Sequence, residues 1–393
     1  MFCSECGLAQ LKHNFDLDAL FRETYGYRSG INHSMRQHLS ELVDGILAKL
    51  TLQDGDIILD IGSNDGTLLK SYPGGDFKRV GIDPTIAQFK QHYPDDIVTI
   101  ADFFTEKAFH AAANGRHAKI ITSIAMMYDL PEPNVFVQEI AKCLAPEGLW
   151  VFEQSYVGLM LKQNAFDTIC HEHLEYYGVR QIDRLLSNHG LRIIDVIFNN
   201  VNGGSFQVHA CHNDAPFTTT PGVAQCLSAE MAAGLDTSAP YFEFRDRILD
   251  FKTRIHEFVT EEHAAGKTFM VYGASTKGNV LMQYCGLDNR IVEAAADRNP
   301  EKWGRRMPGT DIPIISEETA RSRNPDYFLV LPWHFKDEFI VREQEYLNNG
   351  GNIIFPLPEF CVFTRENVAQ ESAKASTFDL HAGNLLEKCL NVH

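Results

Sequence analysis

The stretch that decides the fold is LDIGSNDGTLL, residues 59 to 69. It ends a short apolar run, and the glycines at positions 62 and 66 separate that run from a segment with helical spacing. Glycines at such a turn let backbone amides approach a ligand closely, and the start of a helix favours an anionic group. The stretch therefore predicts a strand, a ligand-binding glycine turn and a helix.

The same alternation continues on both sides of this stretch. Residues 34–50 carry leucine and isoleucine at helical spacing, with Ser34 as the expected helix cap. Strands separated by helices at this rhythm predict a parallel doubly wound sheet. Further strands are expected at 78–84, 96–104, 117–126 and 148–156, and an amphipathic helix at 133–148.

A second pattern of this kind fills the C-terminal half. A long amphipathic helix is expected over about 240–265, followed by a strand, a glycine turn and a helix in KTFMVYGASTKGN, residues 267–279. Further strands are expected at 291–297, 326–333 and 350–358. We therefore predict an α/β chain with two Rossmann-like domains after a short N-terminal segment. The expected domains are residues 1–33, 34–212 and 213–393, with the linker at 213–224.

Composition excludes several classes of protein. The 393 residues are 44% hydrophobic and carry a formal charge of -17, so the chain is globular and a poor partner for nucleic acid. No run of eighteen apolar residues occurs, and the opening MFCSECGLAQ lacks the pattern of a signal peptide, so we expect no membrane partner. Nine cysteines without framework spacing favour a reducing, cytoplasmic location. The oligomeric state stays open.

The acids around the first glycine turn suggest which ligand it binds. The turn is not GxGxxG, and Asp60 lies two residues before the first glycine, where it suits a positive ammonium group better than a pyrophosphate. S-adenosylmethionine carries such a group. Asp83 ends the next strand and suits the ribose hydroxyls, and Asp102-Phe103 suits adenine. The alternative is that Asp60 caps the helix and Asp83 starts a turn. The expected cofactor-binding residues are Asp60, Gly62, Asn64, Gly66, Asp83, Asp102 and Phe103.

The second glycine turn is YGASTKGN, residues 272–279. It is not a Walker motif, because Lys277 precedes the last glycine. The turn is suited to cradling a pyrophosphate, with Asp297 as the ribose-binding acid, although a purely structural turn is the alternative.

Near the N-terminus, Cys3 and Cys6 form half of a zinc site, and no second CxxC exists in the chain. Zinc is expected only if two further ligands join this pair.

DTICHEHLEYYG, residues 167–178, suits either a metal site or proton transfer, or it is a buried polar turn. Two histidines at i and i+2 share one face of a strand, but they lack the HExxH spacing of a zinc enzyme, and no third ligand follows. A histidine can be neutral near pH 7, and a neighbouring carboxylate can orient it. The stretch is therefore compatible with a histidine base supported by the neighbouring Glu172, and we expect His171 to be structural.

Eight stretches together resemble the three-part sugar C-methyltransferases of deoxysugar biosynthesis, which methylate a nucleotide-linked 4-keto sugar at C3. They are CSECGLAQL, YGYRSGINHSMRQH, LDIGSNDGTLL, HEHLEYY, VNGGSF, GASTKGN, ADRNPEKWGRRMPGT and VLPWHF, in the order of that family. The resemblance implies a small zinc-binding domain, a central class I methyltransferase domain and a C-terminal Rossmann-like domain. It also implies that the nucleotide-linked sugar is the small-molecule partner.

The resemblance assigns roles to individual residues. It implies His173 as the base and Glu172 as its support, with Tyr25 and Tyr27 reaching the sugar or the enolate; aromatic packing is the alternative for the tyrosines. Trp333 and His334 either cover the nucleotide base or close the second sheet. The residues expected to bind substrate are Tyr128, Asp129, Asn202, Gly203, Gly273, Ser275, Lys277, Gly278 and Asp297.

The chain also departs from this family. The earlier CxxC pair of the family is absent before Cys3, which indicates either a start assigned too late or a lost metal site. Asp129 stands where many members have histidine, and Cys170 stands where some have tyrosine. These departures keep two alternatives open: a catalytically silent S-adenosylmethionine-binding or scaffold protein, and a nicotinamide-dependent oxidoreductase.

Overall fold

The computed structural model describes residues 1–22 and 25–370, and the chain divides into two compact units. Unit 1 comprises Met1–Tyr156, His171–Asn199 and Ser205–Ala232. Unit 2 comprises Val157–Cys170, Asn200–Gly204 and Ala233–His393. The expected domain limits at 33/34 and 212/213 do not coincide with these units, since residues 213–232 belong to unit 1 and two short segments before residue 212 belong to unit 2.

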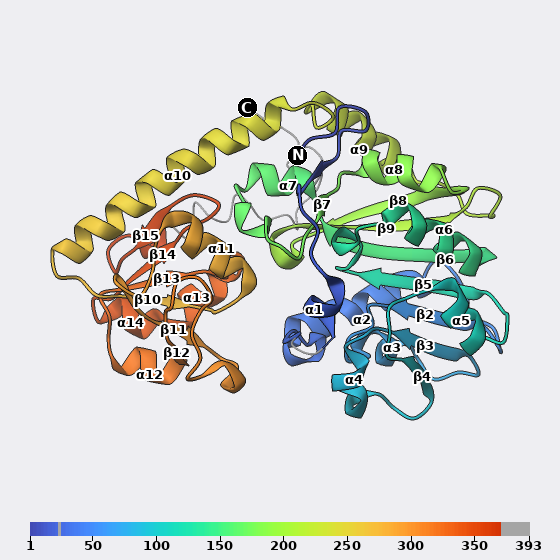
Figure 1. The fold of residues 1–393 in the computed structure, drawn as a ribbon, viewed down its shortest axis with the longest axis horizontal. Coiled ribbons are helices and arrows are strands. Elements are labelled where there is room, and N and C mark those ends of the chain that lie inside the picture. Colours follow the sequence, from blue (N-terminus) through green and yellow to red (C-terminus); the bar gives the residue numbers. More distant parts are fainter. Residues whose placement is uncertain (23–24, 371–393) are drawn as a thin grey trace. The chain divides into compact units, whose positions relative to one another are not determined.

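Unit 1 is built on a seven-stranded sheet in the order β4-β3-β2-β5-β6-β9-β8 (Figure 1). The first five strands are parallel, whereas β9 runs antiparallel to both β6 and β8. The strands are β2 (Ile57–Ile61), β3 (Lys78–Ile82), β4 (Ile97–Ile100), β5 (Ala118–Ile124), β6 (Leu144–Ser155), β8 (Leu191–Asn199) and β9 (Ser205–His212). The expected parallel doubly wound core is therefore confirmed, and two antiparallel strands extend it.

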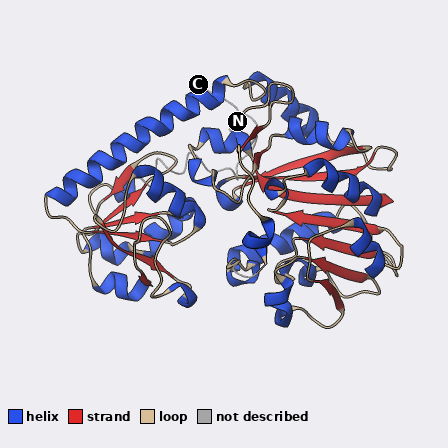
Figure 2. Ribbon diagram, viewed as in Figure 1, coloured by secondary structure: helices blue, strands red, loops and turns tan. Residues whose placement is uncertain are grey.

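Helices flank this sheet (Figure 2), and several of them present an apolar stripe to it. In α2 (His33–Leu47) the stripe consists of Leu39, Leu42, Val43 and Ile46, which pack with Val151 of β6. The cap of α2 is Asn32 rather than the predicted Ser34. The other helices of unit 1 are α1 (Leu17–Phe21), α3 (Thr67–Ser71), α4 (Ile86–Phe89), α5 (Glu106–Ala112), α6 (Pro133–Cys143), α8 (Val179–Ser187) and α9 (Pro221–Ala232), with short 3-10 turns η1 (Ser29–Ile31), η2 (Lys90–His92) and η3 (Met127–Asp129).

The N-terminal residues of unit 1 pair with the HEH region. Strand β1 (Ala9–Gln10) runs antiparallel to β7 (Glu175–Tyr176), so Gln10 lies opposite Glu175. The amide of Gln181 in α8 also donates to the carbonyls of Cys6 and Gly7, at 3.3 and 3.1 Å. The cysteine turn is thus attached to unit 1 by hydrogen bonds, independently of any metal.

Unit 2 contains a six-stranded sheet in the order β12-β11-β10-β13-β14-β15, in which only β15 is antiparallel. Its strands are β10 (Phe269–Tyr272), β11 (Val292–Asp297), β12 (Ile314–Ser316), β13 (Tyr327–Val330), β14 (Asn352–Phe355) and β15 (Cys361–Phe363). The parallel part has the order of a dinucleotide-binding half, so the second Rossmann-like fold is confirmed.

The helices of unit 2 include the long helix expected from the sequence, which is α10 (Ala239–Ala264). The others are α7 (Val157–Lys162), α11 (Thr276–Cys285), α12 (Glu317–Ser322), α13 (Lys336–Arg342) and α14 (Gln344–Asn348), with 3-10 turns η4 (Phe166–Thr168), η5 (Val201–Gly203), η6 (Pro300–Lys302) and η7 (Trp333–Phe335). Among the described residues, none of the helices is both long and apolar enough to cross a membrane.

Candidate active site

The glycine turn between β2 and α3 requires both of its glycines. Gly62 and Gly66 have φ of 72°, a left-handed conformation that favours glycine. A Cβ at Gly66 would lie 2.7 Å from the ring of Tyr93, and one at Gly62 would lie 3.2 Å from Met126. The turn is therefore closely packed against Tyr93 and Met126, which leave no room for a larger side chain at either glycine.

Two buried acids lie beside this turn. Asp83, at the end of β3, accepts hydrogen bonds from the backbone N of Asn64 at 2.9 Å and of Thr85 at 2.6 Å. Asp60 accepts one from Thr122 Oγ1 at 2.6 Å, and burial, with a smaller contribution from Asp83, raises the pKa of Asp60 to about 7. Because a carboxylate has about four acceptor positions, Asp83 can also accept ribose hydroxyls. Asp60 caps no helix, since the N-cap of α3 is Gly66, but Asp83 does start a turn, in which the backbone N of Ile86 donates to its carbonyl at 3.1 Å. Contact of either acid with a ligand stays a prediction.

Asp102 and Phe103 follow β4 on the surface of unit 1. Arg22 donates to Asp102 Oδ1 at 2.9 Å, and its guanidinium lies 5.0 Å from the centre of the Phe103 ring. These contacts hold an aromatic ring and an acid next to the end of β4, as an adenine site requires. The glycine turn, the acid after β3 and this pair therefore fit S-adenosylmethionine.

The HEH region lies against η3, which follows β5. The rings of His173 and Tyr128 are 4.4 Å apart between centroids, edge to face at 62°. The backbone N of Leu174 donates to the Tyr128 carbonyl at 2.8 Å, and the Tyr176 hydroxyl donates to the His173 carbonyl at 3.1 Å. The structure thus brings together the expected base and the expected substrate-binding residues Tyr128 and Asp129.

Carboxyl groups concentrate around this histidine. Burial, and then the charges of Glu172 and Glu175, raise the pKa of Asp129 far above its usual value. Burial raises the pKa of Glu175 to about 8. Asp129 Oδ1 has no hydrogen-bond partner in the part of the chain that the structure describes. The raised pKa favours the protonated form of Asp129, in which its carboxyl group can donate a hydrogen bond.

Tyr25 belongs to the same cluster. Burial, followed by the charges of Asp129 and Glu172, raises the pKa of Tyr25 well above 10, so its hydroxyl stays protonated and can donate. Tyr27 is 44% exposed, and its ring centroid lies 6.4 Å from that of Tyr25. His171 is on the periphery, where its Nε2 is 3.8 Å from Glu172. Within residues 1–22 and 25–370, no group of three or more His, Cys, Asp or Glu can hold a metal ion.

The second glycine turn is equally well defined in unit 2. Gly273 has φ of 85°, and a Cβ there would lie 3.0 Å from Pro332. Ser275 caps α11 by accepting from the backbone N of Gly278 at 3.1 Å. Asp297, at the end of β11, accepts from the backbone N of Ala274 at 2.9 Å. Lys277 Nζ donates to the carbonyl of Asn202 at 3.1 Å, so the residues expected to bind the nucleotide sugar in unit 2 form one group.

Two residues of unit 2 were not assigned a role from the sequence. Asp167, 2% exposed, accepts from Trp333 Nε1 at 2.9 Å, and the Trp333 ring lies 3.4 Å from where a Cβ on Gly203 would be. Trp303 is 44% exposed, and its Nε1 donates to the Asp297 carbonyl at 2.8 Å. An exposed tryptophan one turn after a Rossmann acid is the signal that could have identified it. Of the two roles proposed for Trp333, its low exposure of 6% favours closing the sheet.

The sheet order of unit 1, the glycine turn after its central strand and the acid after the next strand define a class I methyltransferase fold. Two family models agree: a methyltransferase domain over residues 31–196 and a C-methyltransferase C-terminal domain over residues 200–358. The chain is 35% identical over 367 residues to C-methyltransferase NovU of Streptomyces niveus, which covers 93% of this chain and 87% of NovU. The chain therefore belongs to the C-methyltransferase family, and S-adenosylmethionine is its methyl donor.

Solved structures resemble part of the chain more distantly. Magnesium protoporphyrin IX methyltransferase from Synechocystis is 14% identical, with a TM-score of 0.36 over 48% of this chain and 91% of that one. An S-adenosylmethionine-dependent methyltransferase from Clostridium acetobutylicum is 11% identical, with a TM-score of 0.36 over 45% of this chain and 92% of that one.

Proposed function

We propose that this enzyme transfers a methyl group to a carbon atom next to the ketone of a nucleotide-linked keto deoxysugar. The observation that carries the proposal is the position of His173 against Tyr128, in the cluster that also contains Asp129, Glu172 and Tyr25. C-methylation beside a ketone needs a base for the acidic α-proton and hydrogen-bond donors for the enolate oxygen. This cluster contains both kinds of group.

In the proposed mechanism, His173 removes the α-proton and becomes an imidazolium. The carboxylate of Glu172 favours that positive charge, so the proton transfer costs less than it would beside an apolar residue. The hydroxyls of Tyr25 and of protonated Asp129 donate to the oxygen on which negative charge develops. S-adenosylmethionine, when bound, supplies the electrophilic methyl group, held by Asp83 and the backbone of the glycine turn.

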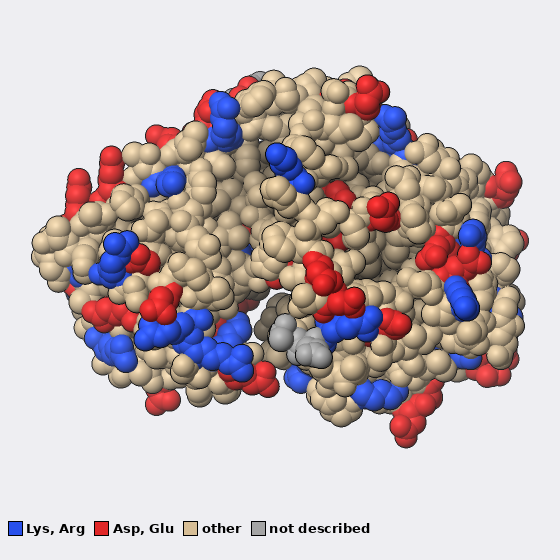
Figure 3. Space-filling view, in the orientation of Figure 1, with Lys and Arg blue, Asp and Glu red and all other residues tan. Residues whose placement is uncertain are grey.

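The nucleotide portion of the substrate is assigned to unit 2. Lys277 is a cation suited to the phosphates, and Asp297 is suited to ribose hydroxyls. Trp303 offers an exposed ring next to Asp297 on which a base can stack. Figure 3 shows lysine and arginine side chains gathered on part of unit 2, although the chain as a whole carries a charge of -17. Zinc binding at Cys3 and Cys6 and the cytoplasmic location stay predictions.

The test is mass spectrometry of the enzyme with S-adenosylmethionine and a panel of nucleotide-linked 4-keto-6-deoxy sugars. We expect a product heavier by one methyl group from at least one sugar, with the new methyl on carbon. Methylation of oxygen, or methylation only of acceptors without a ketone, would contradict the proposal. A panel of the same sugars without the 4-ketone is the matched control.

A further inference from the structure

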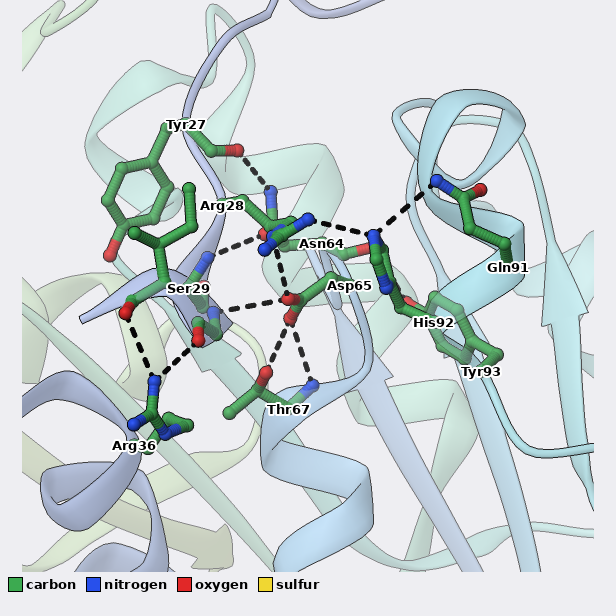
Figure 4. Close-up of polar contacts among 12 residues, drawn as sticks. Tyr27, Arg28, Ser29, Arg36, Asn64, Asp65, Thr67, Gln91, His92 and Tyr93 are labelled. Atoms are coloured by element: carbon green, nitrogen blue, oxygen red, sulfur yellow. Dashed lines mark hydrogen bonds and ion pairs between the residues drawn. The ribbon is translucent and has the colours of Figure 1, made fainter. Parts of the chain in front are cut away.

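The segment of residues 25–31, here called the tyrosine segment, lies on the first glycine turn. The backbone N of Ser29 donates to Asn64 Oδ1 at 2.9 Å, and Asn64 Nδ2 donates to the Tyr27 carbonyl at 3.0 Å. The backbone N of Gly30 donates to Asp65 Oδ2 at 3.1 Å (Figure 4). The amide of Asn64 thus uses both its donor and its acceptor on the segment that carries the two tyrosines.

Charged groups reinforce these bonds. Arg28 Nε lies 3.6 Å from Asp65 Oδ2, and Arg28 Nη1 lies 2.9 Å from His92 Nε2. Arg36, at the start of α2, donates to the carbonyls of Gly30 and Ile31, at 2.7 and 3.1 Å (Figure 4). A cavity of about 320 Å³ borders these contacts, and Arg28, Arg36 and Asp65 are among the residues that line it. The tyrosine segment is therefore held beside this cavity by directional bonds from charged side chains.

The backbone and the side chain of Asn64 serve different partners. Its backbone N donates to Asp83, the acid expected to hold the methyl donor, whereas its side chain binds the tyrosine segment. The residue has φ of 51°, a conformation in which asparagine is favoured over most residues, and is 7% exposed. Asp65 is 3% exposed and also accepts from the backbone N of Thr67, at the start of α3, at 3.2 Å.

We infer that Asn64 and Asp65 are positioning residues, which hold the tyrosine segment on the glycine turn and so place Tyr25 and Tyr27 for the reaction. This inference rests on the proposed function, because it gives the tyrosines a role toward substrate. It replaces the expectation that the Asn64 side chain binds cofactor. One turn then determines both where the methyl donor is held and where the tyrosine hydroxyls lie.

The test is the variant Asn64→Gly, because glycine adopts the left-handed backbone without strain and removes only the amide. The matched control is Asn114→Gly, an exposed asparagine with φ of 53° in another turn of unit 1. Three quantities are measured in each full-length protein: the hydrogen exchange of the Ser29 and Gly30 amides, the Kd for S-adenosylmethionine by calorimetry, and kcat.

In Asn64→Gly we expect the two amides to exchange at least about tenfold faster. The Ser29 amide loses its own hydrogen bond, and the Gly30 amide loses the bonded neighbour that helps to hold it on Asp65. We expect kcat to fall by about 100-fold, the usual cost of a misplaced catalytic group, and Kd to change by less than about threefold. Asn114→Gly should change none of the three. Should Asn64→Gly not fold, Asp65→Asn replaces it; loss of the charge facing Arg28 should also speed exchange and lower kcat.

Unchanged exchange of residues 29 and 30 in Asn64→Gly would overturn the inference, and so would faster exchange with unchanged kcat. Its failure is distinguishable from failure of the proposed function. If the wild-type enzyme methylates no keto sugar, the proposed function fails whatever the exchange shows. If the wild type is active and the variant keeps both its protection and its kcat, only the positioning role fails.

Discussion

At the scale of single residues, the site depends on side chains whose protonation is set by burial. Burial raises the pKa of both Tyr25 and Asp129, with further contributions from Asp129 and Glu172 for Tyr25 and from Glu172 and Glu175 for Asp129. In the proposed mechanism, these two groups are the hydrogen-bond donors to the enolate oxygen. Burial opposes the ionisation of both Asp129 and Glu175, and the charges of Glu172 and Glu175 oppose that of Asp129 further.

Trp303 provides a test of the nucleotide assignment at this scale. Replacing it with alanine should raise the Kd of nucleoside diphosphates about 5- to 150-fold, because stacking of one base on an aromatic ring contributes about 1 to 3 kcal/mol. The measurement is calorimetry with dTDP and UDP on both proteins, and quenching of tryptophan fluorescence checks the value for the wild type. The other two tryptophans, Trp150 and Trp333, are 0% and 6% exposed, so quenching reports on Trp303.

Trp303→Phe is the matched variant, with affinity determined by calorimetry because its fluorescence signal is lost. This variant loses the bond to the Asp297 carbonyl. Because it keeps an aromatic ring on which the base can stack, its affinity for the nucleotide should stay near that of the wild type. Equal affinity for nucleotide in the wild type and in Trp303→Ala would show that the base binds elsewhere.

At the scale of elements, the sequence predicts those strands and turns that are determined locally. The apolar runs at 57–61 and 269–272 end in glycines with positive φ, and both are strands as expected. The antiparallel strands β8 and β9 were not predicted, because their residues are not set apart by glycine turns followed by helices. The pairing of β1 with β7 was also not predicted, since it joins residues 9–10 to 175–176.

The same limit applies to the site. Residues that follow a strand, such as Asp83 and Asp297, were found from their spacing, because parallel strands bring their carboxyl ends to one edge of the sheet. The hydrogen bonds of Asn64 to the tyrosine segment join positions 35 and 37 residues apart. Nothing in the local pattern of LDIGSNDGTLL indicates that an amide in it faces another segment of the chain.

Strand β7 gives a prediction on stability. Burial raises the pKa of Glu175 from 4.5 to about 8, so the folded state keeps a proton that the unfolded chain releases above pH 4.5. The free energy of unfolding should therefore fall as the pH rises from about 4.5 to 8, with the loss complete above pH 8. For Glu175 this contribution is about 3 to 5 kcal/mol, since one pKa unit corresponds to about 1.4 kcal/mol.

The variant Glu175→Gln removes the titrating group. Urea unfolding at pH 5 and pH 9 should show a smaller decrease in stability for this variant than for the wild type. Glu257→Gln, on an exposed position of α10, is the control and should leave the pH dependence unchanged. An equal decrease in Glu175→Gln and in the wild type would show that Glu175 is ionised in the folded protein at neutral pH.

At the scale of the whole molecule, the chain crosses between its two units several times. Residues 157–170 belong to unit 2, where Phe166 packs on Phe251 and Tyr284, with ring centroids 5.5 and 5.0 Å apart. Residues 213–232 belong to unit 1, where Glu230 accepts from the backbone N of Val179 at 2.7 Å and of Arg180 at 2.9 Å. The expected linker at 213–224 therefore lies within unit 1. Composition alone indicated a boundary there because Pro, Thr and Ala also suit the start of α9.

These crossings also place the parts of DTICHEHLEYYG in different units. Asp167 bonds to Trp333 in unit 2, whereas His173 lies against Tyr128 in unit 1. A single motif of twelve residues thus contributes a structural carboxylate to one unit and the proposed base to the other. Sequence spacing alone gives no sign of this division.

The most direct test of the central claim is exchange of the sugar α-proton with solvent deuterium, followed by NMR in the absence of the methyl donor. The wild-type enzyme should exchange the proton next to the ketone. In His173→Asn the exchange rate should fall by at least about 100-fold, the usual contribution of a general base. His171→Asn, the same change two residues away, should keep it. Exchange at the wild-type rate in His173→Asn, with sugar nucleotide still bound, would contradict the assignment of His173 as the base.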